Sequence, residues 1–203
     1  LQPQRVVYAE GGHPSMMKAA VQAKAEGICF PILLGNPDRI NRQAQRLKLD
    51  LSGIKIIDMR ADKEQGRRAT YAKHLAEKLA RKGYTFQEAY DKMYERNYFG
   101  MMMVERGDAD AFITGLYTKY SNTIKVATEV VGVREGFHTF GTMHIVNSQK
   151  GTYFIADTLI NRHPDNNFLV DIARLSANTV EFFNEKPVMA MISYSNFGTD
   201  EIG

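Results

Sequence analysis

Hydroxyl and lysine side chains gather directly after a short apolar run near the middle of the chain. The run 111–114 ends in Thr114-Gly115 and opens into a polar loop and then a helical pattern. In a parallel α/β sheet, ligands bind outside the carboxyl end of a strand and face the N-terminus of the next helix. The stretch is therefore a candidate anion-binding pocket. Its candidate ligand residues are Thr114, Gly115, Thr118, Ser121, Thr123 and Lys125.

Other loops follow apolar runs in the same way. Asp157 comes after one such run, and Ser193 and Ser195 come after the last run of the chain. In a doubly wound sheet several strand-end loops converge on one crevice. We therefore add Asp157, Ser193 and Ser195 to the candidate pocket, with the loops 10–13 and 35–36 beside them.

Each candidate also has a purely structural interpretation. Ser121, together with Asn122, could cap the helix that follows it. Asp157 could be a turn residue, and Lys125 could be a solvated charge as readily as a phosphate partner. His13, which precedes Pro14, is typical of a turn. The residues alone leave these alternatives open.

Several kinds of chemistry lack their motifs in this sequence. It has no Walker motif, GxGxxG, CxxC, HExxH or GxSxG, and its five histidines show no metal-ligand spacing. We therefore expect no metal site, and nothing supports a free-standing nucleotide-dependent dehydrogenase. The net charge is +3 with dispersed basic residues, and no apolar run reaches the roughly 18 residues of a membrane span. Neither a nucleic acid nor a membrane is expected as a partner.

The single cysteine bears on the compartment of the protein. Cys29 lies in an apolar run and excludes an internal disulfide, which fits a reducing cytoplasm. No signal peptide is visible. We therefore expect a cytoplasmic protein.

Strand-like and helix-like patterns alternate along most of the chain. This predicts an α/β fold in which a mostly parallel sheet has helices on both faces, giving three layers. Expected strands are 5–9, 28–34, 54–57, 111–114 and 188–192, with a hairpin at 139–146 and 151–156. Expected helices begin after Asn36 and at the capping-box sequence of Thr85, and further helices are expected at 14–25, 62–82, 121–131 and 165–183.

The hairpin marks a change of organisation. We expect a first lobe over 1–132 and the start of a second lobe, with a mixed sheet, over 133–203. A buried strand at 188–192 would need a covering helix. We therefore expect the natural polypeptide to continue beyond Gly203.

Ordered segments of the chain resemble the phosphate acetyltransferase/phosphate butyryltransferase family. They are YAEGGHPSMMKAA, PILLGNPDRI, YFGMMMVERGDADAFITG, IADTLINRHPD, DIARLSANTVEFF and PVMAMISYSNFGT. The segments GLYTKYSNTIKVA and YSNFG are similar to the branch that forms the C-terminal region of large bacterial NADP-dependent malic enzymes. The resemblance covers nearly the whole chain and about the first two thirds of the family's unit, judged by the strand–helix repeats still missing.

The resemblance also marks where this chain departs from the active acetyltransferases. They carry an arginine-proline pair where this chain has Lys125-Val126, and a second arginine near Leu79, although Arg81 lies close by. Lysine supplies charge but no bidentate fork, and leucine supplies neither. The family's catalytic serine, arginine and aspartate fall beyond Gly203. We therefore assign no catalytic residue here.

The function that the resemblance implies is regulation and oligomerisation of an NADP-dependent malic enzyme, which converts malate to pyruvate. The expected partners are acetyl-CoA, the N-terminal malic enzyme region and a second copy of the chain in a homodimer or larger homo-oligomer. NADP and a divalent metal are implied for the parent's catalytic region, and no cofactor for this segment. The alternatives are an active phosphate acetyltransferase and a dimerisation module that has lost its ligand.

Overall fold

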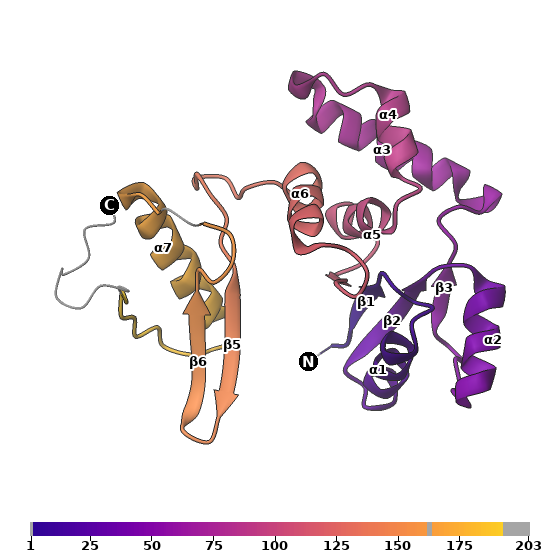
Figure 1. Cartoon of the computed structure of the whole chain (residues 1–203), viewed down its shortest axis with the longest axis horizontal. Coiled ribbons are helices and arrows are strands. Elements are labelled where there is room, and N and C mark those ends of the chain that lie inside the picture. Colours follow the sequence, from indigo (N-terminus) through magenta and orange to yellow (C-terminus); the bar gives the residue numbers. More distant parts are fainter. Residues whose placement is uncertain (1, 162–163, 193–203) are drawn as a thin grey trace. The chain divides into compact units, whose positions relative to one another are not determined.

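A four-stranded parallel sheet organises the first part of the chain (Figure 1). Its spatial order is β3-β2-β1-β4. The strands are β1 (Gln4–Tyr8), β2 (Cys29–Leu34), β3 (Lys55–Ile57) and β4 (Ala111–Ile113). Val7 of β1 pairs with Ile32 on one side and with Phe112 on the other. Because all four strands are parallel, their carboxyl ends lie along one edge of the sheet.

The computed structural model describes residues 2–161 and 164–192. The chain divides into two units, Leu1–Gly132 and Val133–Gly203.

Helices cover both faces of the sheet of the first unit, which confirms the predicted three layers. Side chains alternate along each strand, so Leu33 packs on one face while Ile32 and Leu34 pack on the other. The first face is covered by α1 (Pro14–Ala25) and α2 (Pro37–Leu47). The second is covered by α3 (Gln65–Lys78), α4 (Phe86–Lys92), α5 (Arg96–Glu105) and α6 (Tyr120–Val130).

The predicted caps set the starts of two of these helices. The Asn36 side chain accepts the N–H of Arg39 at the start of α2. Thr85 and Glu88 form a reciprocal capping box at the start of α4. The stretch predicted as one helix over 62–82 is α3 with a short 3₁₀ turn at each end, Asp62–Glu64 and Ala80–Lys82.

The second unit contains the predicted hairpin. Strands β5 (Met143–Ser148) and β6 (Gly151–Ala156) pair antiparallel, with Ser148 opposite Gly151 at the turn. Helix α7 (Asn166–Phe182) follows, and the Asp165 side chain caps it by accepting the N–H of Phe168.

The strand predicted at 188–192 is wrong for this structure. The segment has no strand pairing, and Val188 and Ile192 are 90% and 92% exposed. A strand needs a neighbour whose backbone groups it can pair with, and in the described part of this unit β5 and β6 pair with each other but not with this segment. The sheet in the described part of this unit is accordingly antiparallel rather than mixed.

Candidate functional site

Three polar residues meet at the carboxyl edge of the sheet of the first unit. Glu10 follows β1, Thr114 follows β4, and Asn97 lies in the first turn of α5. The hydroxyl oxygen of Thr114 is 3.1 Å from Oε1 of Glu10 and 3.0 Å from the side-chain amide of Asn97. The backbone N–H of Gly115 also points to Oε1 of Glu10, with an N···O distance of 3.4 Å.

The Thr114 hydroxyl has a single proton to donate. Both neighbours present an oxygen to it, Oε1 of Glu10 and Oδ1 of Asn97, so two acceptors share this donor. Thr114 therefore connects the acidic residue to the start of α5.

Glu10 lies in the predicted loop 10–13, and the sequence alone indicates no role for its side chain. It is only 2% exposed, and its Oε2 has no hydrogen-bond partner among the described residues. The turn that holds it depends on Gly11, where an added Cβ would lie 2.8 Å from the carbonyl oxygen of Leu34. The signal that could have identified Glu10 is an acidic residue placed directly between a buried strand and a Gly-Gly turn.

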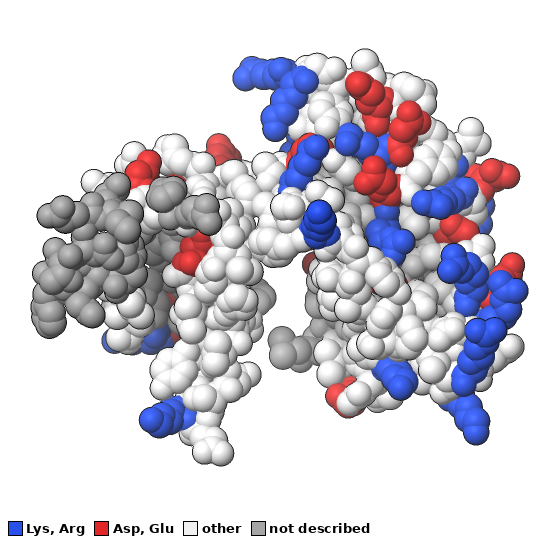
Figure 2. All heavy atoms as spheres, in the orientation of Figure 1, with Lys and Arg blue, Asp and Glu red and all other residues white. Residues whose placement is uncertain are grey.

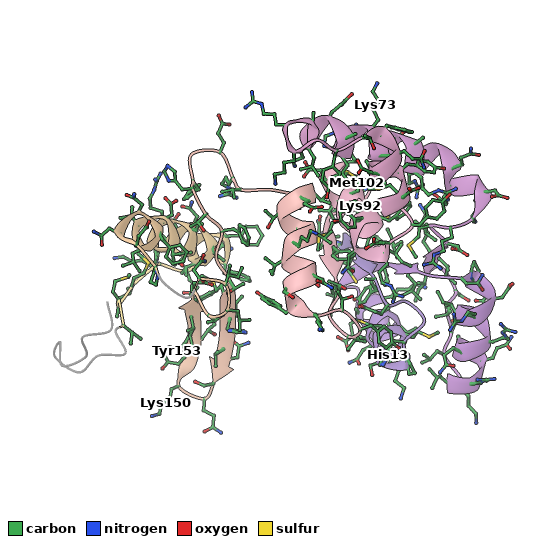
Figure 3. All side chains as sticks on the ribbon, turned by 45° about the horizontal axis from the view of Figure 1, so that its top comes forward. His13, Lys73, Lys92, Met102, Lys150 and Tyr153 are labelled. Atoms are coloured by element: carbon green, nitrogen blue, oxygen red, sulfur yellow. The ribbon has the colours of Figure 1, made fainter. Side chains whose placement is uncertain are left out.

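The loop after Gly115 lies near the start of α1. The ring edge of His13 meets Tyr117, with 5.5 Å between centroids, and the Arg96 guanidinium lies 5.8 Å from the Tyr117 ring centre. Nδ1 of His13 also accepts the N–H of Ser15, so His13 caps α1 (labelled in Figure 3). This agrees with the structural interpretation of His13, while its ring still borders the loop that carries the candidates.

The helix predicted from Ser121 begins one residue earlier, and Ser121 does not cap it. Lys119 is the N-cap, without a side-chain hydrogen bond, and Asn122 donates its N–H to the carbonyl of Lys119. The exposed Ser121 is thus inside the first turn of α6. Thr118 is half-buried in the loop, and the buried hydroxyl of Thr123 has no partner among the described residues.

Lys125 lies on α6 beside a buried carboxylate. Its Nζ is 3.9 Å from Oε1 of Glu129, one turn along the helix, and its side chain is 66% exposed. Glu129 also accepts hydrogen bonds from Tyr98, at 2.5 Å, and Tyr84, at 3.3 Å. Burial, together with the bond to Glu129, raises the pKa of Tyr98, so this phenol stays a donor. Lys125 is therefore a solvated charge with one weak partner, and it remains free to meet an anion.

Another lysine, Lys92, contacts the Tyr98 phenol directly. Nζ of Lys92, on α4, is 3.1 Å from the hydroxyl of Tyr98 and 4.5 Å from its ring centre. Figure 3 labels Lys92 among the helices of this layer. No polar contact within the described residues joins this group to Thr114 or Gly115. The structure thus places Thr114 and Gly115 at Glu10 and Lys125 at Glu129. Among the described residues, no hydrogen bond brings Thr118, Ser121 or Thr123 to either acid.

Asp157 lies in the second unit, where it holds a turn. It accepts four hydrogen bonds, from the backbone and side chain of Thr142 and of Asn161, at 2.6–2.9 Å. Burial acts to raise the pKa of Asp157, but these bonds outweigh it and hold the pKa at about 2. The geometry favours the turn interpretation. Ser193 and Ser195 lie outside the described residues.

Charges and metal-binding side chains are dispersed. On the face of the first unit seen in Figure 2, Lys and Arg atoms are interspersed with Asp and Glu atoms. Over residues 2–161 and 164–192, His, Cys, Asp and Glu form no group of three that could hold a metal ion. The helices found there are also too short or too polar to cross a membrane.

Comparison with known proteins decides the family. The sequence profile described as phosphate acetyl/butaryl transferase matches residues 1–202. The chain belongs to this family. A solved family structure, the EutD phosphotransacetylase from Staphylococcus aureus, superposes with a TM-score of 0.83 at 27% identity, and the match covers 98% of this chain and 59% of that one.

Family members with different names are similar to this chain. An NADP-dependent malic enzyme of Escherichia coli (strain K12) is 32% identical over 200 residues, which are 98% of this chain and 26% of the enzyme. A phosphate acetyltransferase of Bacillus subtilis (strain 168) is 30% identical over 195 residues, 96% of this chain and 59% of the enzyme. The chain thus spans about a quarter of the one relative and under two thirds of the other.

The family resemblance directs attention to one further position. Leu79, which the resemblance implies as the counterpart of an arginine in the active acetyltransferases, is 4% exposed and packs in the core beneath α3. Arg81 is exposed in the following 3₁₀ turn, and Val126 is buried on α6. Leu79 is therefore a core residue in this family member.

Proposed function

We propose that this chain is the regulatory and oligomerisation part of an NADP-dependent malic enzyme that converts malate to pyruvate. It binds acetyl-CoA at the carboxyl edge of the first unit and lowers the activity of the parent enzyme. The chain itself carries no catalytic residue. NADP and a divalent metal belong to the parent's catalytic region, and we derive no step through either.

The burial of Leu79 is the observation that carries this proposal. A phosphate acetyltransferase must position two anionic substrates, and arginines do this by offering two parallel donors to each phosphate. The position that the resemblance matches to one such arginine is Leu79, which lies inside the core. The other is Lys125, an exposed lysine with one weak partner, Glu129. Lys125 can still attract an anion, but neither of these two positions offers the guanidinium fork that would hold a phosphate in a reactive arrangement.

Regulation requires that the acetyl-CoA site and the malate site share a coupling free energy, typically about 1–3 kcal/mol. We propose that a homodimer or larger homo-oligomer of this part supplies the contact with the N-terminal malic enzyme region. A cytoplasmic location fits the single free and buried Cys29.

The experiment that tests the proposal uses the complete parent protein. Malate-dependent reduction of NADP is measured while acetyl-CoA is titrated, and the rate is expected to fall several-fold in a saturable way. Thiol release from acetyl-CoA in phosphate buffer is measured on the same preparation and should stay at the uncatalysed rate. Steady thiol release would overturn the proposal. A rate of malate-dependent NADP reduction that does not change with acetyl-CoA concentration would overturn it as well.

An active phosphate acetyltransferase is the second candidate. It is favoured by the 30% identity to the phosphate acetyltransferase of Bacillus subtilis and by the TM-score of 0.83 with the phosphotransacetylase of Staphylococcus aureus. The thiol-release measurement separates it from the regulatory function. A dimerisation module without a ligand would show neither thiol release nor acetyl-CoA binding.

A further inference from the structure

Glu10 is a buried carboxylate with an unused acceptor. We propose that its Oε2 accepts a hydrogen bond from an amide N–H or a hydroxyl of the bound ligand. This edge of the sheet then binds the neutral pantetheine arm of an acyl thioester of CoA and repels the phosphates of the same ligand. The inference rests on the proposed function, in which that ligand is acetyl-CoA.

The first argument is the state of the two carboxylate oxygens. Oε1 has two neutral donors, the hydroxyl of Thr114 and the N–H of Gly115. Oε2 has none within the described part of the chain, and Glu10 forms no ion pair there. A buried acceptor without a donor is costly, and a buried carboxylate more so. A ligand that brings a donor to Oε2 removes this cost when it binds.

The second argument is charge. An ionised carboxylate in a weakly polar site repels a phosphate and attracts hydrogen-bond donors. An acyl thioester of CoA carries both kinds of group: its arm has two amide N–H groups and a hydroxyl, and its nucleotide end has phosphates. Glu10 therefore distinguishes the two ends of one ligand, and the phosphates are left for cationic side chains such as Lys125.

The third argument is access. Oε2 is buried in this structure, so a ligand reaches it only if a neighbouring segment moves, and the loop that begins at Gly115 adjoins this carboxylate through Oε1. The loop residues Leu116 and Tyr117 are exposed rather than packed in a core. Segments with few buried contacts open at low free-energy cost. Opening this loop brings the arm of the ligand to Glu10.

The test is Glu10→Gln, which keeps the size of the side chain but replaces an acceptor with a donor. Binding of acetyl-CoA and of inorganic phosphate is measured separately by calorimetry on the full chain. We expect the acetyl-CoA affinity to fall at least tenfold, while the phosphate affinity stays equal or rises. Glu77→Gln, an exposed residue of α3, is the matched control and should change neither.

The outcomes separate this inference from the proposed function. If the unaltered chain binds acetyl-CoA and Glu10→Gln binds it equally well, Glu10 has only a structural role and the inference fails alone. If the unaltered chain binds no acetyl-CoA, both fail. Should Glu10→Gln not fold, Glu10→Asp decides: it keeps the charge but withdraws the oxygen, and the same tenfold loss is expected.

Discussion

Lys78 on α3 closes the C-terminal end of α6: its Nζ is 2.9 Å from the carbonyl oxygen of Val131, and it also contacts the carbonyl of Val130. The same ammonium group is 2.7 Å from Oε1 of Glu105 on α5. A cation at this place satisfies carbonyls that have no partner in their own helix and complements the helix dipole. One side chain thus joins three of the helices that cover the second face of the sheet.

Replacing this lysine is expected to destabilise the first unit. Lys78→Met keeps most of the aliphatic packing but leaves the carbonyls and Glu105 without their donor. We expect a loss of about 1–2 kcal/mol in the free energy of unfolding, measured by urea denaturation. Lys73→Met, at an exposed position of the same helix, is the control and should change stability little. Equal midpoints for the two variants would contradict the capping role.

Two glycines offer a paired test of packing against the sheet. A Cβ at Gly100, in α5, would lie 2.2 Å from the ring of Phe112, whereas a Cβ at Gly66, in α3, would meet nothing within 4 Å. We expect Gly100→Ala to cost about 1–3 kcal/mol through overpacking. Gly66→Ala should gain up to about 1 kcal/mol from helix propensity. Thermal unfolding measures the stability of both variants. If Gly100→Ala were as stable as the unaltered protein, α5 and Phe112 of β4 would have to lie farther apart than in this structure.

Asp157 makes the second unit sensitive to acid. Its folded pKa of about 2 lies below the ordinary value of 3.8, so its ionised form stabilises the fold. This contribution is complete above pH 4 and is lost as the pH falls toward 2. Asp157→Asn should therefore lower stability by about 1 kcal/mol at pH 7, allowing for solvent screening. The difference from the unaltered protein should vanish near pH 2, as followed by urea unfolding at several pH values. A difference that is the same at every pH would contradict the assignment.

Lys125 offers a test of the pocket that is independent of Glu10. Lys125→Glu places a negative charge in the middle of α6 and should weaken acetyl-CoA binding about tenfold, as measured by calorimetry. Lys125→Arg keeps the charge and supplies a bidentate fork, so it should bind at least as tightly as the unaltered chain. Unchanged binding in both variants would move the phosphate site away from α6.

Much of the fold could be predicted because its signals are local. Short continuous apolar runs indicated β1 and β2, and side-chain caps indicated the helix starts at Asn36 and Thr85. The run 188–192 has the same apolar composition but pairs with no described strand. Composition shows that a segment can be a strand, whereas pairing depends on what lies beside it.

The position of the loop at Thr114-Gly115 could be predicted from the sequence, but its contacts could not. The loop at Thr114-Gly115 does follow β4 and meets the end of β1. The sequence predicts no role for Glu10, because a single acidic residue in a turn belongs to no recognisable motif. Its importance comes from burial and from a partner 104 positions away. The environment of Lys125 likewise could not be predicted, because it depends on the buried carboxylate of Glu129 one turn along α6.

The strand order has a consequence for how the chain is made. β1 finds its neighbour β2 soon after both are synthesised, but its other neighbour, β4, is held by contacts such as the one between Arg5 and Asp110, 105 positions apart. Until β4 has left the ribosome, one side of β1 offers unpaired backbone groups to any extended chain nearby. We therefore expect the arrival of β4, rather than the formation of the β1–β2 pair, to govern the yield of correctly folded protein during translation.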